Sequence, residues 1–509
     1  MRAIYREISV LSIAYLDKNG FLLFNYSSFG MTAGRKRPLD GGDTRLLLLK
    51  ICLEALSALL GFWLLVNLAY QLFLSIFGFK RNTVDYHKHD PESRFLVLVP
   101  AHNEKRVIGD IVRNLQAMEY PKDLYDFYVI ADNCTDNTAE IARKAGAKVI
   151  ETFRSGPDEP TGKPVALKKA LEQLKDYQDR YDLMMVFDAD NLIDTNMFQE
   201  VNSQYLDKGK PDFIQCYLGA KNKAGVIAWF YYTGYTLTNR FFDLAKHRLN
   251  TNCVIGGTGF AVTTAYLYER GGWTTKSLTE DFEIQVEATL KGRRILWNHS
   301  VRVYDEKPTT LRTSIRQKIR WGQGHWYVTF NNTGRLFKAF FTRQIKFREF
   351  FSLLMYMYSI ATYIGVILQL LIAVLLALIT PGEPIIRFSV AGLVIGVLAF
   401  GYTALVLFYV ADWIDNKISF KWRTIPMMFI SSIANMIVGL FNQIGGLFLW
   451  RRQQNWRETK HVLNKETLVR QQEHKENKLH ASEDALTKKQ AVEQIRVEKD
   501  AVNAEVRVG

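Results

Sequence analysis

The chain has 509 residues, of which 48% are hydrophobic, and it carries a formal net charge of +14. Because the hydrophobic residues are concentrated in a few long uncharged runs, the rest of the chain has room for one soluble catalytic unit. The basic residues flank those runs and fill the C-terminal tail, which favours anionic membrane lipids as partners. No zinc-finger spacing or aromatic RNA-binding signature is present, so we expect no nucleic acid partner. The four cysteines lack pairing spacing, and we expect no structural disulfide.

Residues 1–54 contain no secretory signal pattern, and we expect them to form a leader before a first membrane helix at residues 55–79. A helix needs about 20 apolar residues to cross a hydrocarbon layer of about 30 Å. Buried core helices are the alternative, but long uncharged runs are uncommon in soluble cores. Three more membrane segments are therefore predicted within residues 350–450, at 350–382, 388–411 and 424–450.

The central region, residues 80–348, alternates short apolar strands with amphipathic helices, which predicts an α/β sheet covered by helices. We expect three of its strands at residues 95–99, 125–131 and 183–187. Ligands of a parallel sheet bind outside the carboxyl ends of its strands, so polar side chains that follow the strands should meet at one edge. Those side chains are Asn103, Glu104, Asp132, Asp188 and Asp190.

The last part of the central region and the tail differ in amino-acid composition. We expect a closing strand at residues 292–298 and then a helix at residues 311–330, which mixes basic, aromatic and apolar residues. That mixture is typical of a helix lying on a membrane interface. Residues 451–509 are highly charged and poor in large apolar side chains, and we expect a solvated cytoplasmic tail.

Three polar motifs carry candidate chemistry. Asp188-Ala-Asp190 offers two carboxylates at a strand end, a hard-oxygen site suited to Mg²⁺ or Mn²⁺ on a diphosphate. Thr279-Glu280-Asp281 is typical of a helix start, and an Asp presented there also has the reach of a general base. Gln317-x-x-Arg320-Trp321 supplies a fixed charge for phosphate and a flat face for a sugar ring, although alone it would be one side of an amphipathic helix.

In this order the motifs resemble the family 2 inverting glycosyltransferases of GT-A fold, in the membrane-embedded branch that includes cellulose, hyaluronan and poly-N-acetylglucosamine synthases. The resemblance covers about residues 95–326 and continues into the membrane segments. It implies a Rossmann-like nucleotide-diphospho-sugar transferase domain of the α/β class with flanking transmembrane helices. The loop at residues 256–259 lacks the cysteine-glycine-serine of cellulose synthases, which argues against a cellulose product.

The resemblance also implies a role for each motif. Asp281 is the general base, and Asp188 and Asp190 hold Mg²⁺ or Mn²⁺. Gly257, Glu280 and Trp321 lie at the acceptor. Lys163 matches a lysine near the diphosphate, although an ordinary lysine at a helix start is the alternative. The residues that bind the nucleotide sugar are Asn103, Glu104, Asp132, Lys163, Asp188, Gln317 and Arg320.

Three functions are compatible with these residues. The first is transfer from a UDP-sugar to a growing β-linked polysaccharide by a multi-pass plasma-membrane protein whose catalytic domain faces the cytoplasm. The second is a glycosyltransferase that adds one sugar to a lipid such as diacylglycerol or a polyprenyl carrier. The third is a catalytically idle domain that serves as a receptor or scaffold. We expect one C-terminal segment to be interfacial, since this keeps the basic tail cytoplasmic.

Overall fold

The computed structural model describes residues 15–16, 22–23, 41–81, 83–154, 156, 159, 161–223, 225–380, 401, 405–417, 422 and 424–453. The chain divides into two compact units, residues 1–55 and residues 56–509. The first unit contains a two-stranded antiparallel ladder of β1 (Tyr15–Leu16) and β2 (Leu22–Leu23). Helix α1 (Gly41–Gly78) begins in the first unit and continues into the second. Most of the expected leader and tail lies outside the described residues.

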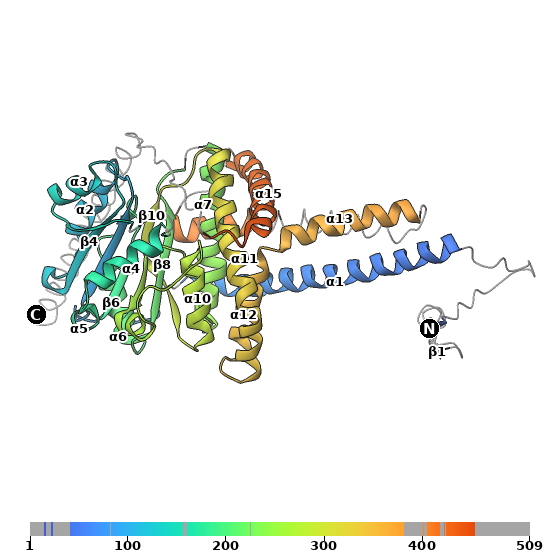
Figure 1. The fold of residues 1–509 in the computed structure, drawn as a ribbon, viewed down its shortest axis with the longest axis horizontal. Coiled ribbons are helices and arrows are strands. Elements are labelled where there is room, and N and C mark those ends of the chain that lie inside the picture. Colours follow the sequence, from blue (N-terminus) through green and yellow to red (C-terminus); the bar gives the residue numbers. More distant parts are fainter. Residues whose placement is uncertain are drawn as a thin grey trace, which may run out of the picture. The chain divides into compact units, whose positions relative to one another are not determined.

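The second unit is built on an eight-stranded mixed sheet with the order β5-β4-β3-β6-β9-β8-β10-β7 (Figure 1). Strands β5, β4, β3 and β6 are parallel, whereas β9 runs antiparallel to β6 and β8, and β7 runs antiparallel to β10. The α/β prediction is therefore confirmed, with an antiparallel part that the sequence pattern did not indicate. The strands are β3 (Phe95–Ala101), β4 (Tyr125–Asp132), β5 (Lys148–Thr152), β6 (Leu183–Val186), β7 (Leu192–Ile193), β8 (Phe213–Ala220), β9 (Phe260–Thr263) and β10 (Ile295–Asp305).

Both faces of the sheet are covered, which explains why its central strands are continuous apolar runs. Along β3, Phe95, Val97 and Val99 belong to one hydrophobic cluster, and Leu96 and Leu98 belong to another. This alternation follows from the two-residue period of a strand. The first face packs against α2 (Ile108–Gln116), α3 (Thr138–Lys144) and α6 (Met197–Asp207). The second packs against α4 (Lys163–Gln173), α9 (Thr264–Glu269) and α10 (Glu280–Leu290).

Two elements extend further than the sequence predicts. The closing strand β10 continues past residue 298, because it pairs with β8 up to Asp305 across a register shift. Helix α11 (Leu311–Phe341) passes the polar stretch at residues 331–334 that ended the expected pattern. There Asn332 Nδ2 donates to the Val328 carbonyl at 2.8 Å and Thr333 Oγ1 donates to the Thr329 carbonyl at 2.7 Å. These polar side chains bond back to the helix, so they do not end it.

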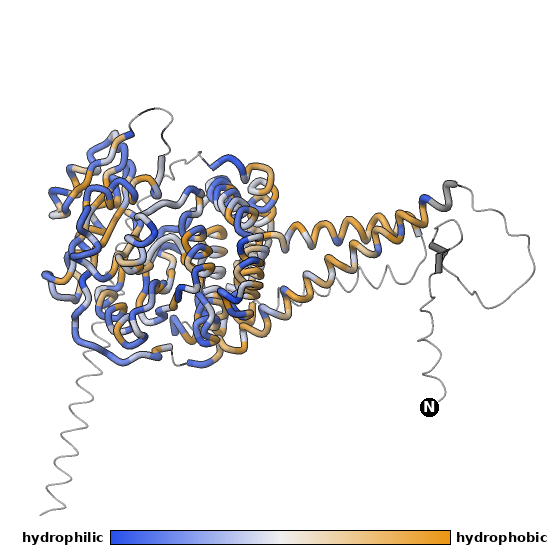
Figure 2. Tube along the Cα trace, turned by 60° about the horizontal axis from the view of Figure 1, so that its bottom comes forward, coloured by the Kyte–Doolittle hydropathy of each residue, from blue (hydrophilic) through white to orange (hydrophobic). Residues whose placement is uncertain are grey.

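Two described helices are long and apolar enough to cross a membrane, at Arg45–Gly78 and Thr362–Ile379. The uncharged run at residues 350–382 is divided between α12 (Phe347–Ser359) and α13 (Thr362–Ile379). Helix α13 contacts α1, since Gln369 Nε2 donates to Ser57 Oγ at 2.7 Å. Figure 2 shows α1 and α13 as the most continuously hydrophobic helices. Most of the expected segment at residues 388–411 lies outside the described residues.

Helix α15 (Thr424–Leu449) packs along α11 and α7 (Gly225–Thr238) of the catalytic unit. Its approach to α11 is close, because a methyl group on Gly446 would lie 2.5 Å from the backbone carbon of Gly322. Only Ile437–Leu449 of α15 forms an apolar segment, and this is shorter than a membrane span. The last predicted membrane segment therefore packs against α11 and α7 over its described residues.

The helical residues 405–416 are also held by side chains of α7, β10 and residue 240. Asp415 accepts a hydrogen bond from Arg240 Nη1 at 2.6 Å, and its carbonyl accepts one from Arg302 Nη2 at 2.8 Å. Asp412 accepts one from the hydroxyl of Tyr232. Both aspartates are nearly completely buried, and buried charges are stable only when they are paired in this way.

Candidate functional site

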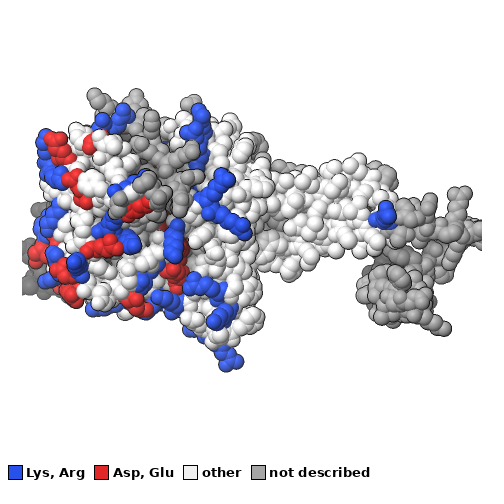
Figure 3. All heavy atoms as spheres, viewed as in Figure 1, with Lys and Arg blue, Asp and Glu red and all other residues white. Residues whose placement is uncertain are grey.

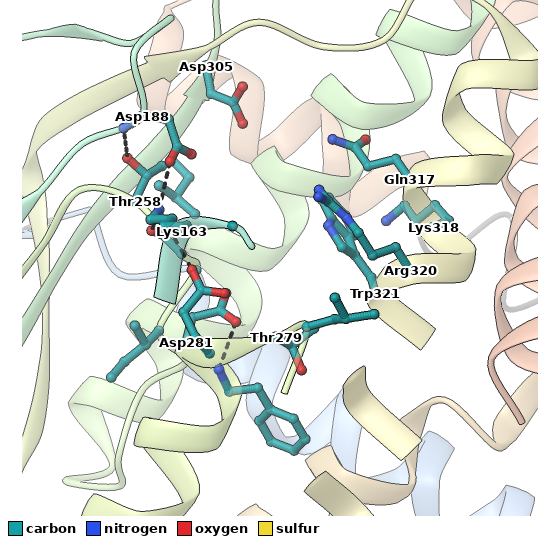
Figure 4. A pocket seen from close by; sticks show the side chains of 18 of the residues that line it. Lys163, Asp188, Thr258, Thr279, Asp281, Asp305, Gln317, Lys318, Arg320 and Trp321 are labelled. Atoms are coloured by element: carbon teal, nitrogen blue, oxygen red, sulfur yellow. Dashed lines mark hydrogen bonds and ion pairs between the residues drawn. The ribbon is translucent and has the colours of Figure 1, made fainter. Parts of the chain in front are cut away.

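A cavity of about 2880 Å³ opens at the carboxyl ends of β3, β4 and β6. Its walls come from these strand ends, the glycine loop at residues 256–259, the start of α10 and one face of α11. Residues of α12, α13 and α15 close its far side. Figure 4 shows that Lys163, Asp188 and Asp281 face the side chains of α11 across this space. Of the polar residues expected to meet at one sheet edge, Glu104, Asp132, Asp188 and Asp190 line this cavity, whereas Asn103 does not.

Asp188 and Asp190 follow β6 and line the cavity. The Asp188 side chain is 43% exposed, and its backbone N–H is held by Asn191 Oδ1 at 3.0 Å. Asp190 is buried, and its carboxylate accepts hydrogen bonds from Glu306 N and Asn191 Nδ2, both at 3.3 Å. The Asp188 side chain is therefore partly open to the cavity, whereas Asp190 is held by the Glu306 N–H and the Asn191 amide.

The part of the cavity at the ends of β3 and β4 is lined by Asp132, Glu104 and His102. Asp132 is buried at the end of β4 and accepts a hydrogen bond from Thr152 Oγ1 at 2.8 Å. His102 Nδ1 lies 2.7 Å from the Asp132 carbonyl oxygen, so the ring fixes the strand end. Asn103 does not line the cavity: its Oδ1 accepts a hydrogen bond from Thr135 N at 2.8 Å and braces the neighbouring loop.

Lys163 is the first residue of α4 and lies at the centre of the site. It follows Gly162, whose φ of 115° is accessible to glycine and strained for other residues. Its ammonium group donates to Asp188 Oδ1 at 2.6 Å and to the Gly257 carbonyl at 2.5 Å, and it lies 3.8 Å from Glu280 Oε1. Burial lowers the pKa of Lys163, but Asp188 and Glu280 outweigh burial, so the pKa is raised.

Glu280 and Asp281 form a pair of partly buried carboxyl groups at the start of α10. Burial raises the pKa of Glu280 to about 7, and Lys163 opposes this rise. Burial also raises the pKa of Asp281, whereas the Phe282 N–H, 2.8 Å from Asp281 Oδ1, lowers it. A methyl group on Gly257 would lie 3.0 Å from Asp281 Oδ2, so glycine is needed there both for space and for its φ of 79°. A carboxylate with a raised pKa is suited to take a proton near neutral pH.

Helix α11 supplies the opposite wall with Gln317, Arg320 and Trp321 (Figure 4). Gln317 Oε1 accepts a hydrogen bond from the Tyr231 hydroxyl at 3.0 Å, which fixes its amide. Burial lowers the pKa of Arg320, and the carboxylates of Glu280, Asp188 and Asp281 counteract this. A guanidinium stays protonated under such conditions, so the wall keeps a fixed positive charge.

Sequence reasoning missed Lys318, which lies between Gln317 and Arg320 in the chain and also lines the cavity. Its ammonium group lies 4.3 Å from the ring centroid of Trp321 and 5.1 Å from that of Tyr231. Burial lowers the pKa of Lys318 to about 7. The only sequence signal for Lys318 was its position inside the motif. In a helix it is rotated away from the face that carries Gln317 and Arg320, so helical periodicity does not place it in the site.

Within the described residues, no three His, Cys, Asp or Glu side chains converge as a metal site. The two motif carboxylates nevertheless fit a divalent ion, since Mg²⁺ is usually held by one or two protein carboxylates together with substrate phosphates and water. Asp188 and Asp190 line one cavity and supply hard oxygen donors of that kind.

Residues 91–324 match the family described as Glycosyltransferase like family 2. The chain is 26% identical over 298 residues to a probable glycosyltransferase, YdaM, of Bacillus subtilis, covering 54% of this chain and 66% of that protein. It is 27% identical over 241 residues to a beta-monoglucosyldiacylglycerol synthase of Synechocystis (46% and 48%). It is 23% identical over 273 residues to a poly-beta-1,6-N-acetyl-D-glucosamine synthase of Staphylococcus aureus (53% and 63%). The matches thus span about half to two thirds of these relatives.

Among solved structures, the chain resembles the mannosyltransferase PcManGT of Pyrobaculum calidifontis in complex with GDP-Man and Mn²⁺. The TM-score is 0.51 at 17% sequence identity, and the superposition covers 75% of this chain and 99% of that one. This likeness concerns the fold. Together with the family match, it shows that residues 91–324 form a glycosyltransferase family 2 domain with the GT-A fold.

Proposed function

We propose that this protein transfers a sugar, with inversion, from a UDP-sugar to a growing β-linked polysaccharide at the membrane. The observation that carries the proposal is the position of Lys163, which contacts Asp188 and lies 3.8 Å from Glu280. One ammonium group therefore links the carboxylates proposed for the donor to the pair that contains Asp281. The cavity wall opposite them holds Arg320, which suits a diphosphate leaving group.

In the proposed reaction, ionised Asp281 accepts the proton of an acceptor hydroxyl. The hydroxyl oxygen then forms a bond to the anomeric carbon while the bond from that carbon to the diphosphate breaks. The negative charge that develops on the diphosphate is stabilised by Lys163 and Arg320. Trp321 offers a ring face to the acceptor sugar, and Gly257 leaves room beside Asp281. Asp132 and Glu104 line the part of the cavity proposed for the nucleoside, and Asn103 supports that part through Thr135.

Asp188 and Asp190 are the residues that would hold Mg²⁺ or Mn²⁺. Such an ion, when bound, neutralises diphosphate charge as a Lewis acid. The Glu306 N–H holds the Asp190 carboxylate in place, and the Lys163 ammonium group compensates the negative charge of Asp188.

The proposal places the protein in the plasma membrane with its catalytic unit in the cytoplasm, where nucleotide sugars are made. Helices α1 and α13 could anchor it, and Lys80 and Arg81 directly after α1 agree with the positive-inside tendency. The contacts of residues 405–416 and of α15 with the catalytic unit support a tail on the cytoplasmic side. Protease protection of a tagged tail in inside-out vesicles tests this: a protected tail contradicts it.

A lipid glycosyltransferase that adds one sugar is the second candidate, and one observation favours it. The cavity extends from Asp281 to Tyr356 of α12 and Tyr363 of α13. Helix α13 contacts the apolar helix α1, so an acceptor held in the membrane could reach the base from that side.

The deciding experiment measures the size of the product. The purified protein is reconstituted in vesicles and incubated with radiolabelled UDP-sugars and Mg²⁺ or Mn²⁺, beside Asp281→Asn. We expect labelled polymer from the wild type and none from the variant. A single labelled lipid would replace the polysaccharide proposal with the lipid one, and transfer that does not depend on Asp281 would refute the assignment of the base.

A further inference from the structure

The segment from Pro308 to Arg348 contains nine Lys and Arg residues and no Asp or Glu. It forms α11 and the beginning of α12, which together make a helical hairpin. The first half of α11 faces the catalytic cavity. The second half and the turn, residues 335–348, form a separate surface that we name the hairpin tip. No step of the proposed transfer uses this surface.

The hairpin tip combines exposed aromatic rings with exposed cations. Phe341 is 75% exposed, Phe347 63% and Phe337 39%. The acid that follows the tip in the chain, Glu349, accepts a hydrogen bond from Asn252 N at 3.1 Å, and its other carboxylate oxygen lies 3.9 Å from Arg348 Nε. Lys and Arg side chains gather around the end of the hairpin (Figure 3). The cations of the tip are Arg335, Lys338, Arg343, Lys346 and Arg348.

Helix α12 contacts α1 near the catalytic end of that apolar helix. The Tyr70 hydroxyl donates to Ser352 Oγ at 3.1 Å, and the rings of Trp63 and Tyr358 lie 6.2 Å apart. In Figure 1, α12 crosses α1 near the sheet. The hairpin therefore packs directly against the helix that would anchor the chain in the proposed function.

We infer that the hairpin tip inserts Phe337, Phe341 and Phe347 into the membrane interface and binds anionic phospholipid headgroups through its Lys and Arg side chains. Exposed aromatic rings flanked by cations are the composition that binds such an interface. The inference rests on the membrane anchoring in the proposed function. Because the same helix carries Gln317, Arg320 and Trp321, the lipid contact holds the catalytic wall at the membrane surface.

The test uses the full chain in vesicles, with Cys52 and Cys134 replaced by Ser so that the buried Cys216 and Cys253 remain. An environment-sensitive fluorophore is attached at Phe341→Cys and, as a matched control, at Lys144→Cys on α3. Quenching by lipids with a nitroxide near the headgroup is compared in phosphatidylcholine and in phosphatidylcholine with phosphatidylglycerol. The tip variant Lys338→Gln/Arg343→Gln/Lys346→Gln is measured beside it.

We expect strong quenching at position 341, little at position 144, and more quenching with phosphatidylglycerol. Each neutralised cation should lower the ratio of inserted to free tip by about fivefold. Equal quenching at 341 and 144 would overturn the inference, and would leave the tip as a surface for another protein. Quenching that is independent of phosphatidylglycerol would overturn the headgroup contact. If quenching occurs without sugar transfer, the inference stands and the proposed function fails.

Discussion

Replacing Lys163 with Met should shift the pH dependence of transfer as well as reduce its rate. The Lys163 ammonium group lies 3.8 Å from Glu280, and it lowers the pKa of both Glu280 and Asp281. With an effective dielectric constant of about 20, a charge pair at this distance interacts by about 4 kcal/mol, or about three pKa units as an upper bound. Removing the ammonium group therefore raises both pKa values.

The direction of the shift follows from the role of Asp281. A base works only when ionised, and a raised pKa leaves more of the carboxyl group protonated at a given pH. The acid limb of kcat/KM should therefore move to higher pH by about one to three units in Lys163→Met. The loss of a charge at the diphosphate should also lower the plateau by about 10²–10³-fold.

The assay is the initial rate of transfer between about pH 5.5 and 9.5 in the reconstituted protein. Lys168→Met is the matched control, because Lys168 lies on the same helix but pairs with Glu172 at an exposed position. Its profile should overlay that of the wild type. A Lys163→Met profile that is lowered equally at every pH, with no shift of the acid limb, would refute the electrostatic link between Lys163 and Asp281.

Three other substitutions probe the base, the metal and the packing of α11. Asp281→Asn should lower kcat by about 10²–10⁴-fold while UDP binding by calorimetry is unchanged, and equal losses of both would contradict a base. Asp190→Asn should raise the Mn²⁺ concentration needed for half-maximal transfer, and an unchanged titration would remove Asp190 from the metal site. Gly322→Ala should destabilise the protein by about 1–3 kcal/mol in thermal unfolding, because its methyl group would meet the Asn442 carbonyl at 2.3 Å. Gly334→Ala on the same helix meets nothing within 4 Å and should not destabilise; equal effects of the two would contradict the close packing.

The sequence predicts the parallel half of the sheet well and the antiparallel half poorly. Continuous apolar strands that end in Asp132 and Asp188 carry their own signal, because both faces of these strands are buried. Strand β9 has only four residues, and its place between β6 and β8 depends on contacts across the fold. Local hydrophobic periodicity does not indicate which strands pair with each other across the fold.

The sequence likewise predicts one part of the candidate site and not the other. The motif residues Lys163, Asp188 and Asp281 lie together as expected, since each follows a strand or begins a helix at one edge. The role of Asn103 as a brace for Thr135 could not be read from the chain, because it depends on two loops that meet only in the fold. Likewise, the position of α15 against α11 depends on glycines whose packing partners are more than a hundred residues away.

The close crossing of Gly322 and Gly446 has a consequence for the order in which the enzyme is made. The family 2 match ends at residue 324, but Gln443 in α15 and Gln453 after it also line the cavity. Gln453 even holds the loop before Asp281, since its Oε1 accepts a hydrogen bond from Leu278 N at 2.8 Å. A ribosome-bound chain that has completed only the sheet therefore has an unfinished site. All residues that line the cavity are present only after residue 453 has been synthesised, when the apolar helices α1 and α13 have already emerged.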